Sequence, residues 1–305
     1  MHILRGFDDW PRGPLHLAIG VFDGVHRGHQ ELIGRLRKGA DAQGASAIAI
    51  TFDPLPVEAL APGAPPSELS EPEERADLLG AAGADAVVVL TFDRRFAQTP
   101  ARDFVARLLA AGDVRRIVVG RDFRFGHDRE GDVTLLSVLG GARGVIVDVV
   151  PPVERDGAIV SSTRIRNLLV AGDVPAAADL LGRAYSVSGP IVHGDKRGRA
   201  LGYPTINVAT PPRRLLPRDG IYATWVTIAG ERRAAATSLG VRPTFGHGER
   251  VLESYILDFS GDVYGHDALT TFVERIRDEL RFETARELVE RIAEDVEATR
   301  RALGR

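Results

Sequence analysis

The sequence predicts an α/β protein of two domains, a doubly wound parallel sheet of Rossmann-like type followed by a small antiparallel β-barrel with a closing helix. Apolar runs of strand length recur at intervals of roughly thirty residues up to Val150, with helical patterns between them, which is the period of βαβ units. Beyond Arg183 this alternation stops, and short segments separated by Gly, Pro and Asp take over, a pattern typical of a barrel. A chain of 305 residues is long enough for each domain to bury a core of its own.

The expected strands of the first domain are Leu15–Phe22, Ala45–Phe52, Ala86–Leu90, Arg116–Gly120 and Val145–Val150. The helical patterns between them run from Gly28 onward and over Glu73–Ala82, Ala101–Ala111 and Asp132–Leu139. Ligands of doubly wound sheets bind at the carboxyl ends of the strands. Residues that directly follow a strand are therefore the first candidates for a site.

The expected strands of the second domain are Tyr185–His193, Ile221–Ala229, Arg232–Leu239, Leu252–Phe259 and Ala268–Ile276. An amphipathic helix over Glu283–Leu303 closes the chain. We place the domain boundary near Arg183, which gives domains of residues 1–183 and 184–305.

Composition excludes several classes of function. The formal net charge of −3 provides no general attraction for nucleic acid, and the lack of cysteine excludes disulfides, thiolate catalysis and Cys-ligated zinc. No apolar run approaches the ~20 residues of a membrane span, and the start of the chain lacks the apolar core of a signal peptide. We expect a cytoplasmic protein whose partners are small molecules rather than nucleic acid or a membrane. The sequence leaves open whether the chain forms a homo-oligomer.

The stretch Gly20–Gln30 (GVFDGVHRGHQ) follows the first expected strand and opens a helix. Its two histidines, His26 and His29, are three residues apart and therefore lie on one side of the helix entry. Free backbone N–H groups and the positive end of the helix dipole lie there too, which favours a bound polyphosphate. A metal pair completed by Asp23, or exposed histidines without a role, are alternatives that the residue types leave open.

A second loop, Gly120–Gly126 (GRDFRFG), follows the fourth expected strand. It combines a carboxylate, two arginines and two aromatic side chains, a composition that suits a flat, partly anionic ligand. A surface turn with buried phenylalanines is the alternative.

The segment Val160–Arg166 (VSSTRIR) opens another helix with three hydroxyls and two arginines. Arginine is unfavourable near the positive end of a helix dipole unless an anion is present. An ordinary Ser/Thr cap explains the hydroxyls but not the arginines. We therefore expect a triphosphate here, bound by Ser161, Ser162, Thr163 and Arg164.

The second domain contains a glycine-rich loop with three cations, His193–Gly202 (HGDKRGRALG), which lacks the Walker spacing. In the segment that follows, Tyr203–Asn207 (YPTIN), a hydroxyl and an amide oxygen at Thr205 and Asn207 could hold ATP phosphates and Mg²⁺. A solvated basic hairpin competes with this interpretation for the loop more than for Thr205 and Asn207. Glu253 lies in an alternating strand, where a glutamate usually faces solvent.

These segments, in this order, resemble the bacterial bifunctional riboflavin kinase/FAD synthetases, which belong to the wider HxGH-type nucleotidyltransferases. The matching family motifs are GxFDGVHxGH, VG(D/E)(D/N)FxFG, ISSTxIR, HGDxRGRxLG(F/Y)PTxN and a VRPTF run that precedes the strand of Glu253. The resemblance covers roughly residues 3 to 300 of the chain.

The resemblance implies two reactions. The second domain would transfer the γ-phosphoryl group of ATP to riboflavin, with Glu253 as the base on the ribityl hydroxyl and with Mg²⁺ on Thr205 and Asn207. The first domain would let the phosphate of FMN attack the α-phosphorus of a second ATP, which gives FAD and pyrophosphate. His26 and His29 would stabilise the developing charge, and no general base is needed.

The resemblance also implies which residues bind. Nucleotide phosphates are expected on Gly20, Phe22, Asp23, Gly24, Ser161, Ser162, Thr163 and Arg164 in the first domain, and on Gly194, Lys196, Gly198 and Arg199 in the second. The flavin is expected on Asp122, Phe123, Phe125 and Arg242. The small-molecule partners are then ATP, riboflavin and FMN.

One departure from the family bears on function. Leu55 stands between two prolines where family members commonly have a polar residue, often His. This motivates an alternative, a riboflavin kinase with a degenerate adenylyltransferase domain. A regulator that only binds flavin or nucleotide is disfavoured because Glu253, Thr205 and Asn207 are all present. Ser238 and Tyr255 replace a common Asn and His, and neither is expected to carry chemistry.

Overall fold

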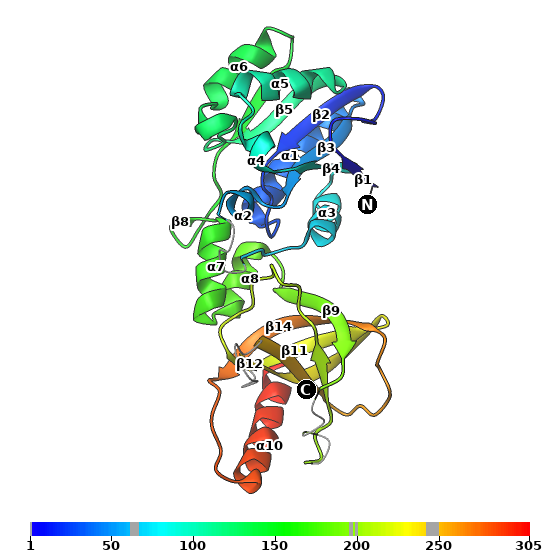
Figure 1. Cartoon of the computed structure of the whole chain (residues 1–305), viewed down its shortest axis with the longest axis vertical. Helices are drawn as coiled ribbons and strands as arrows, with labels where there is room; N and C mark the ends of the chain where they lie inside the picture. Colours follow the sequence, from blue (N-terminus) through cyan, green and yellow to red (C-terminus); the bar gives the residue numbers. More distant parts are fainter. Residues whose placement is uncertain (1, 62–66, 195–197, 199–200, 242–249) are drawn as a thin grey trace. The chain divides into compact units, whose positions relative to one another are not determined.

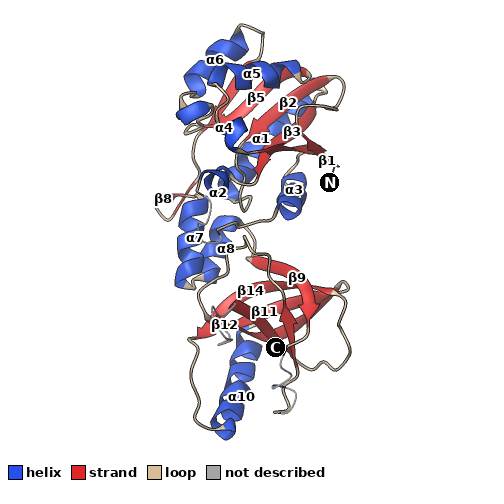
Figure 2. Cartoon of the chain, in the orientation of Figure 1, coloured by secondary structure: helices blue, strands red, loops and turns tan. Residues whose placement is uncertain are grey.

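The computed structural model of the chain describes residues 2–61, 67–194, 198, 201–241 and 250–305. It consists of two compact units, Met1–Ser162 and Thr163–Arg305, which the colours of Figure 1 follow from blue to red. Figure 2 shows how they differ, with helices between the strands in the first unit and a strand-rich second unit. The prediction of functional domains that meet near Arg183 stays a prediction.

The first unit is built on a six-stranded parallel sheet with the strand order β1-β4-β3-β2-β5-β6. The strands are β1 (His2–Arg5), β2 (Pro14–Ile19), β3 (Ser46–Asp53), β4 (Ala86–Thr91), β5 (Asp113–Gly120) and β6 (Ile146–Val150). Five of them were predicted. The sixth, β1, has only four residues, too few to show a hydrophobic period, and it forms by pairing with β4. A short hairpin of β7 (Glu154–Arg155) and β8 (Ala158–Ile159) follows the sheet.

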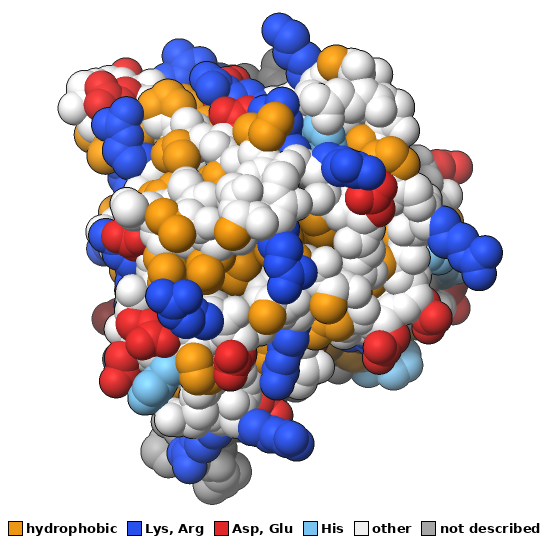
Figure 3. All heavy atoms as spheres, turned by 90° about the horizontal axis from the view of Figure 1, so that it is seen from above, with side chains coloured by type: hydrophobic (Ala, Val, Ile, Leu, Met, Phe, Trp, Pro, Cys, Tyr) orange, Lys and Arg blue, Asp and Glu red, His pale blue; other side chains and the backbone are white. Residues whose placement is uncertain are grey.

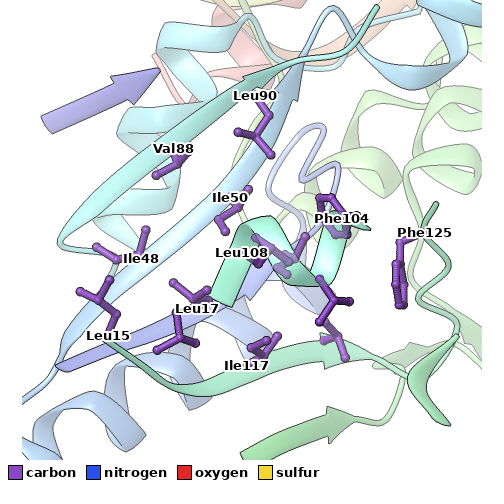
Figure 4. Close-up of a cluster of buried hydrophobic side chains, with 14 of the residues drawn as sticks. Leu15, Leu17, Ile48, Ile50, Val88, Leu90, Phe104, Leu108, Ile117 and Phe125 are labelled. Atoms are coloured by element: carbon purple, nitrogen blue, oxygen red, sulfur yellow. The ribbon is translucent and has the colours of Figure 1, made fainter. Parts of the chain in front are cut away.

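Helices cover both faces of this sheet, as expected for a doubly wound fold. They are α1 (Arg27–Gln43), α2 (Pro56–Leu60), α3 (Pro72–Ala81), α4 (Arg94–Ala97), α5 (Ala101–Ala110) and α6 (Val133–Gly141), with a 3-10 turn η1 (His127–Arg129). Because side chains alternate along a strand, Leu15 and Leu17 of β2 pack toward Phe104 and Leu108 of α5 (Figure 4). Ala18 of the same strand packs in the opposite cluster, with α1 and α3.

The strand order places two of the predicted motifs side by side. β2 lies between β3 and β5. After β2 the chain first adds β3 and β4 on one side of it, and then adds β5 and β6 on the other side. This is the topological switch point at which doubly wound sheets bind ligands. The stretch Gly20–Gln30 follows β2, and the loop Gly120–Gly126 follows β5.

The second unit is a closed antiparallel barrel with the strand order β10-β13-β12-β11-β14-β9. Its strands are β9 (Ser186–Val192), β10 (Thr205–Val208), β11 (Gly220–Ile228), β12 (Glu231–Val241), β13 (Arg250–Ile256) and β14 (Asp267–Arg277). The strand missing from the prediction is β10, whose four residues were interpreted as part of a binding motif. Closure leaves no unpaired sheet edge.

Among the described residues from Ser162 onward, three helices accompany the barrel: α7 (Ser162–Ala171), α8 (Val174–Leu181) and α10 (Ala285–Ala302). α8 packs against β14, and α10 packs against β11, β12 and β14. Arg277 of β14 holds α10 with two bonds to the Asp295 carboxylate, of 2.7 Å from Nε and 2.5 Å from Nη2. The predicted fold class, a doubly wound parallel sheet followed by a small antiparallel barrel with a closing helix, is therefore confirmed.

Candidate active sites

The loop between β2 and α1 has a conformation that its sequence alone does not favour. Phe22 and Val25 have positive φ angles of 53° and 40°, which aromatic and β-branched residues rarely adopt. Both side chains are fully buried, so packing enforces the conformation. Strain of this kind is concentrated at functional sites, where it fixes the direction of nearby side chains.

His26 and His29 lie together at the beginning of α1, as predicted. The Nδ1 atom of His26 caps the helix by accepting a hydrogen bond of 3.4 Å from the backbone N–H of His29. The two rings are stacked, with centroids 3.6 Å apart and an interplanar angle of 17°. The edge of the His29 ring also meets the ring of Phe22 at 5.2 Å. The helix cap at His26 and the ring contact with Phe22 thus both hold the histidine pair in place.

His29 is held in its neutral form. Burial lowers the pKa of His29 well below its ordinary value of 6.5, and the neighbouring His26 and the Arg75 guanidinium lower it further. The Nδ1 atom of His29 is buried and has no hydrogen-bond partner within the described part of the chain. A neutral imidazole carries one N–H donor, so His29 can donate one hydrogen bond to a phosphate oxygen.

Asp23 supports the loop from within. It is fully buried, and its carboxylate accepts bonds of 2.9 and 3.1 Å from the backbone N–H of Leu69 and of 3.1 Å from that of Ser70. Within the described ranges there is no group of three or more His, Cys, Asp and Glu residues that could hold a metal ion, so nothing there supports the metal-pair alternative. The contact of Asp23 with a nucleotide stays a prediction.

A cavity of about 710 Å³ opens beside His29 at the carboxyl ends of the strands. The predicted residues Gly20, Phe22, Asp122, Phe123 and Phe125 line it together with His29. The rings of Phe123 and Phe125 are stacked, with centroids 5.4 Å apart. The structure thus brings the predicted phosphate loop and the predicted flavin loop to one cavity.

Much of the cavity wall was not predicted. Four more phenylalanines line it, and two charged residues and a histidine from the turn after the predicted loop complete its rim. These residues are Phe52, Phe92, Phe96, Phe104, His127, Asp128 and Arg129. Arg124, one of the two arginines of the predicted loop Gly120–Gly126, also lines the cavity. Phe92 and Phe96 directly follow the third expected strand, so the rule that ligands bind where strands end could have identified them. A broad aromatic surface with a charged rim suits a planar ring that carries a phosphate chain.

The beginning of α7 is joined to the same loop. Ser162 Oγ donates a hydrogen bond of 3.0 Å to the backbone oxygen of Asp23. Ser161 is half-buried beside it. Thr163 and Arg164 belong to the second compact unit, and their contact with ATP stays a prediction.

In the second unit, the register of β10 and β13 brings three predicted residues together. Asn207 lies directly opposite Glu253, and Thr205 precedes Asn207 by two residues on the same side of β10. Thr205 Oγ1 donates a hydrogen bond of 2.5 Å to Glu253 Oε1. Hydroxyl and amide oxygens are ligands that Mg²⁺ prefers, so Thr205 and Asn207 fit a magnesium site.

A second cavity, of about 640 Å³, opens beside Thr205 and Asn207. Gly194 lines it, and a Cβ on Gly194 would lie 2.2 Å from Asn207 Nδ2. Any residue larger than glycine there would require the Asn207 side chain to move. The cavity also includes the segment Phe259–Tyr264, which carried no recognisable signal. Lys196, Arg199 and Arg242 lie outside the described residues.

Together the fold and the two sites define a two-domain nucleotide-binding enzyme, with a phosphate loop beside an aromatic cavity in one domain and hard oxygen ligands in the other. The family model described as FAD synthetase matches residues 11–164, and the one described as riboflavin kinase matches residues 181–303. The chain belongs to the bifunctional riboflavin kinase/FMN adenylyltransferase family, as the motifs predicted.

Two curated relatives illustrate this membership. The bifunctional riboflavin kinase/FMN adenylyltransferase of Pseudomonas fluorescens is 40% identical over 285 residues, which cover 93% of this chain and 91% of the relative. The enzyme of the same description from Escherichia coli K12 is 35% identical over 309 residues, covering 100% and 98% of the two chains.

A solved structure from Streptococcus pneumoniae shares the whole fold. It matches with a TM-score of 0.91 and 33% identity over 98% of this chain and 99% of its own, and it is described as a macrolide-efflux protein. Within the described part of the present chain, no helix has the length and hydropathy to cross a membrane.

Proposed function

We propose that the two activities of this family are carried out at separate sites in this chain, FMN adenylylation in residues 1–183 and riboflavin phosphorylation in residues 184–305. The observation that supports this most is the presence of two cavities, each lined by residues of one unit that include part of that unit's motifs. The chain converts riboflavin to FMN and FMN to FAD, with ATP as the co-substrate of both reactions.

In the kinase reaction we assign Glu253 as the general base. It takes the proton of the terminal ribityl hydroxyl while that oxygen bonds to the γ-phosphorus of ATP and the bond to the β-phosphate oxygen breaks, which leaves ADP. The short bond from Thr205 orients the carboxylate. Mg²⁺ bound on Thr205 and Asn207 would neutralise charge on the ATP phosphates.

In the adenylyl transfer an oxygen of the FMN phosphate attacks the α-phosphorus of ATP, and the bond from that phosphorus to pyrophosphate breaks. The attacking phosphate is already ionised near neutral pH, so no proton has to be removed. His26 and His29 stabilise the charge that develops on the phosphates, and the aromatic cavity holds the flavin ring. Phosphate contacts from the remaining predicted residues of both loops belong to the same proposal.

The kinase-only alternative is not favoured. Leu55 is 1% exposed and is not among the residues that line the cavity. Its lack of a hydrogen-bonding group therefore takes no donor away from the site. The curated relatives are bifunctional by description.

The proposed partners are the small molecules ATP, riboflavin and FMN, and we place the reactions in the cytoplasm, where ATP and the flavins are dissolved. Over the face in Figure 3, acidic and basic side chains both occur, and hydrophobic ones lie between them. The expectation of no nucleic-acid partner rests on the formal net charge of −3.

The proposal is tested by incubating the purified chain with riboflavin, ATP and Mg²⁺ and by resolving riboflavin, FMN and FAD by chromatography over time. FMN should appear first and FAD should follow, and neither should form without ATP. Accumulation of FMN alone would establish the kinase-only alternative. Absence of both products, with flavin binding retained, would identify a binding protein instead.

A further inference from the structure

Arg75 of α3 is a buried charge beneath the adenylylation site. It is the largest fully buried side chain among the described residues. The carboxylate of Glu68, also buried, lies 3.9 Å from Nη2 of Arg75. Burying a guanidinium is costly, and an apolar residue of similar volume often stabilises a core as well or better. A role in filling space alone therefore does not explain why an arginine is here.

The contacts of Arg75 lead to the phosphate loop by one route through Ser70. Arg75 Nη2 donates a bond of 2.9 Å to the backbone oxygen of Ser70. The hydroxyl of Ser70 in turn accepts a hydrogen bond of 2.8 Å from the backbone N–H of Gly24. The backbone N–H of Ser70 donates a hydrogen bond to the Asp23 carboxylate. Arg75 thus fixes the residue that holds Asp23 and Gly24.

A second route runs through the end of β3. Arg75 Nη1 donates to the backbone oxygen of Phe52 at 2.9 Å and to Thr51 Oγ1 at 3.4 Å. Thr51 Oγ1 donates a bond of 2.8 Å to the backbone oxygen of Val21. The loop Val21–Gly24 is therefore held near its start and near its end by partners of one guanidinium.

The guanidinium also acts on His29 through its charge. After burial and the neighbouring His26, Arg75 is the third cause that keeps the pKa of His29 below its ordinary value. This direction agrees with the geometric argument, which places Arg75 beneath the loop that leads to His29.

We propose that Arg75 is a positioning residue for adenylyl transfer, which fixes the loop Val21–Gly24 through Ser70 and Thr51 and thereby directs His29 toward the reacting phosphates. The inference rests on the adenylylation site proposed above. Catalytic groups must be held tightly, since a displacement of about 1 Å can cost on the order of 100-fold in rate.

The test compares kcat and KM for the conversion of FMN and ATP to FAD by the full-length chain. The variants are Arg75→Met, Arg75→Lys, His29→Ala and the double variant Arg75→Met with His29→Ala. Riboflavin phosphorylation by the same preparations reports whether the rest of the chain is intact. The matched control is Arg116→Met, since Arg116 is a mostly buried arginine in β5 of the same unit and pairs with Asp148 at 3.1 Å.

Arg75→Met should lower kcat for FAD formation by about 30-fold while KM for ATP and the kinase rate change by less than about threefold. Arg75→Lys should recover part of the loss, because an ammonium can still donate to the backbone oxygens of Ser70 or Phe52. Arg116→Met should stay within about twofold of wild type. With His29 already replaced, Arg75→Met should add less than about threefold, since the positioning of an absent ring cannot be lost.

A folded Arg75→Met variant with wild-type kcat overturns the proposal, and so do losses that multiply in the double variant. Those results leave the site assignment standing if His29→Ala alone is impaired. Full activity of His29→Ala refutes the assigned role of the histidine and this proposal with it. If Arg75→Met does not fold, Ser70→Ala and Thr51→Val test the same two links. Each should lower kcat by about 3- to 10-fold, and wild-type kcat in both overturns the proposal.

Discussion

The two active sites of this chain are held in place by different means. In the first unit, the two histidines proposed for catalysis lie on a strained loop and the first turn of a helix. Buried polar side chains from β3, from α3 and from the segment before α3 support them. In the second unit, Thr205, Asn207 and Glu253 lie on two neighbouring strands, and their spacing follows from the register of the barrel. One site depends on tertiary hydrogen bonds, the other on backbone pairing.

This difference predicts different sensitivities to mutation. A strand ladder fixes its side chains through many equivalent backbone bonds, so only direct steric or chemical changes should disturb it. A loop held by a few buried polar contacts is sensitive to changes at residues that touch no substrate. The predictions below probe this contrast.

Among changes outside the assigned catalytic residues, the largest effect is expected from Gly194→Ala in the kinase site. The added Cβ would lie 2.2 Å from Asn207 Nδ2 and 2.8 Å from its Cγ, so the Asn207 side chain must move. Riboflavin phosphorylation should fall by about 10- to 100-fold while FAD formation from FMN is unchanged. Gly34→Ala is the control, because its Cβ would meet nothing within 4 Å. A wild-type kinase rate in Gly194→Ala would refute the assigned position of Asn207.

A smaller effect, on thermal stability, is expected when the second domain is expressed as a fragment that begins before or after helices α7 and α8. α8 packs on β14, and Val174, Ala177, Leu180 and Leu181 of this helix are buried. Burying an aliphatic side chain contributes about 1.5 to 3 kcal/mol, so a fragment of residues 163–305 should melt well above one of residues 184–305. Both fragments should phosphorylate riboflavin and make no FAD. A folded but inactive shorter fragment would show that α7 and α8 complete the kinase site.

Leu55→His should destabilise the first unit without increasing its rate of FAD formation. The side chain is 1% exposed, and an imidazole buried there without a partner costs about 1 to 3 kcal/mol. Thermal melting should shift downward, and FAD formation should not increase. The matched control is Val57→His, two residues further on in the first turn of α2, where the side chain is 52% exposed. A faster FAD synthesis in Leu55→His would support the degenerate-domain alternative.

The smallest effect concerns pH. The pKa of His29 is lower in the folded chain than its ordinary value of 6.5, so the unfolded chain binds the proton first as pH falls. The stability that neutral His29 provides is therefore full above pH 6.5 and is lost as pH falls from 6.5 toward the lower folded pKa. One such group changes the unfolding free energy by at most about 1.4 kcal/mol per pH unit.

Urea unfolding at pH 7.5 and 5.5 measures this change, and His29→Gln should show a weaker pH dependence than wild type. Burial also lowers the pKa of His16, so His16→Gln should weaken the dependence in the same direction and serves as the comparison. An identical pH dependence in wild type and His29→Gln would contradict the neutral state of His29.

Local sequence predicted what depends on local spacing. The pairing of His26 with His29 follows from three-residue spacing at a helix entry, and the placement of Thr205 and Asn207 on one face follows from two-residue spacing in a strand. The fold class followed from the change in hydrophobic pattern near Arg183. Two strands of four residues, β1 and β10, escaped because they form only through pairing with distant strands.

What the sequence could not predict depends on contacts across long separations. Asp23 bonds to Leu69 and Ser70, more than forty positions along the chain, so its supporting role is invisible in the motif. Arg75 is an ordinary basic residue of a helix until its burial is known. Its charge would have been assigned to the solvent-exposed face.

The central claim is that one chain holds two separable sites, and two variants test it most directly. Riboflavin-to-FMN and FMN-to-FAD conversion are measured separately for Glu253→Gln and for the double variant His26→Ala with His29→Ala. Glu253→Gln should lose FMN formation by at least about 100-fold and keep FAD formation, and the histidine variant should show the reverse. If either variant loses both activities while its circular dichroism and melting remain those of wild type, the two sites are not separate and the account is wrong.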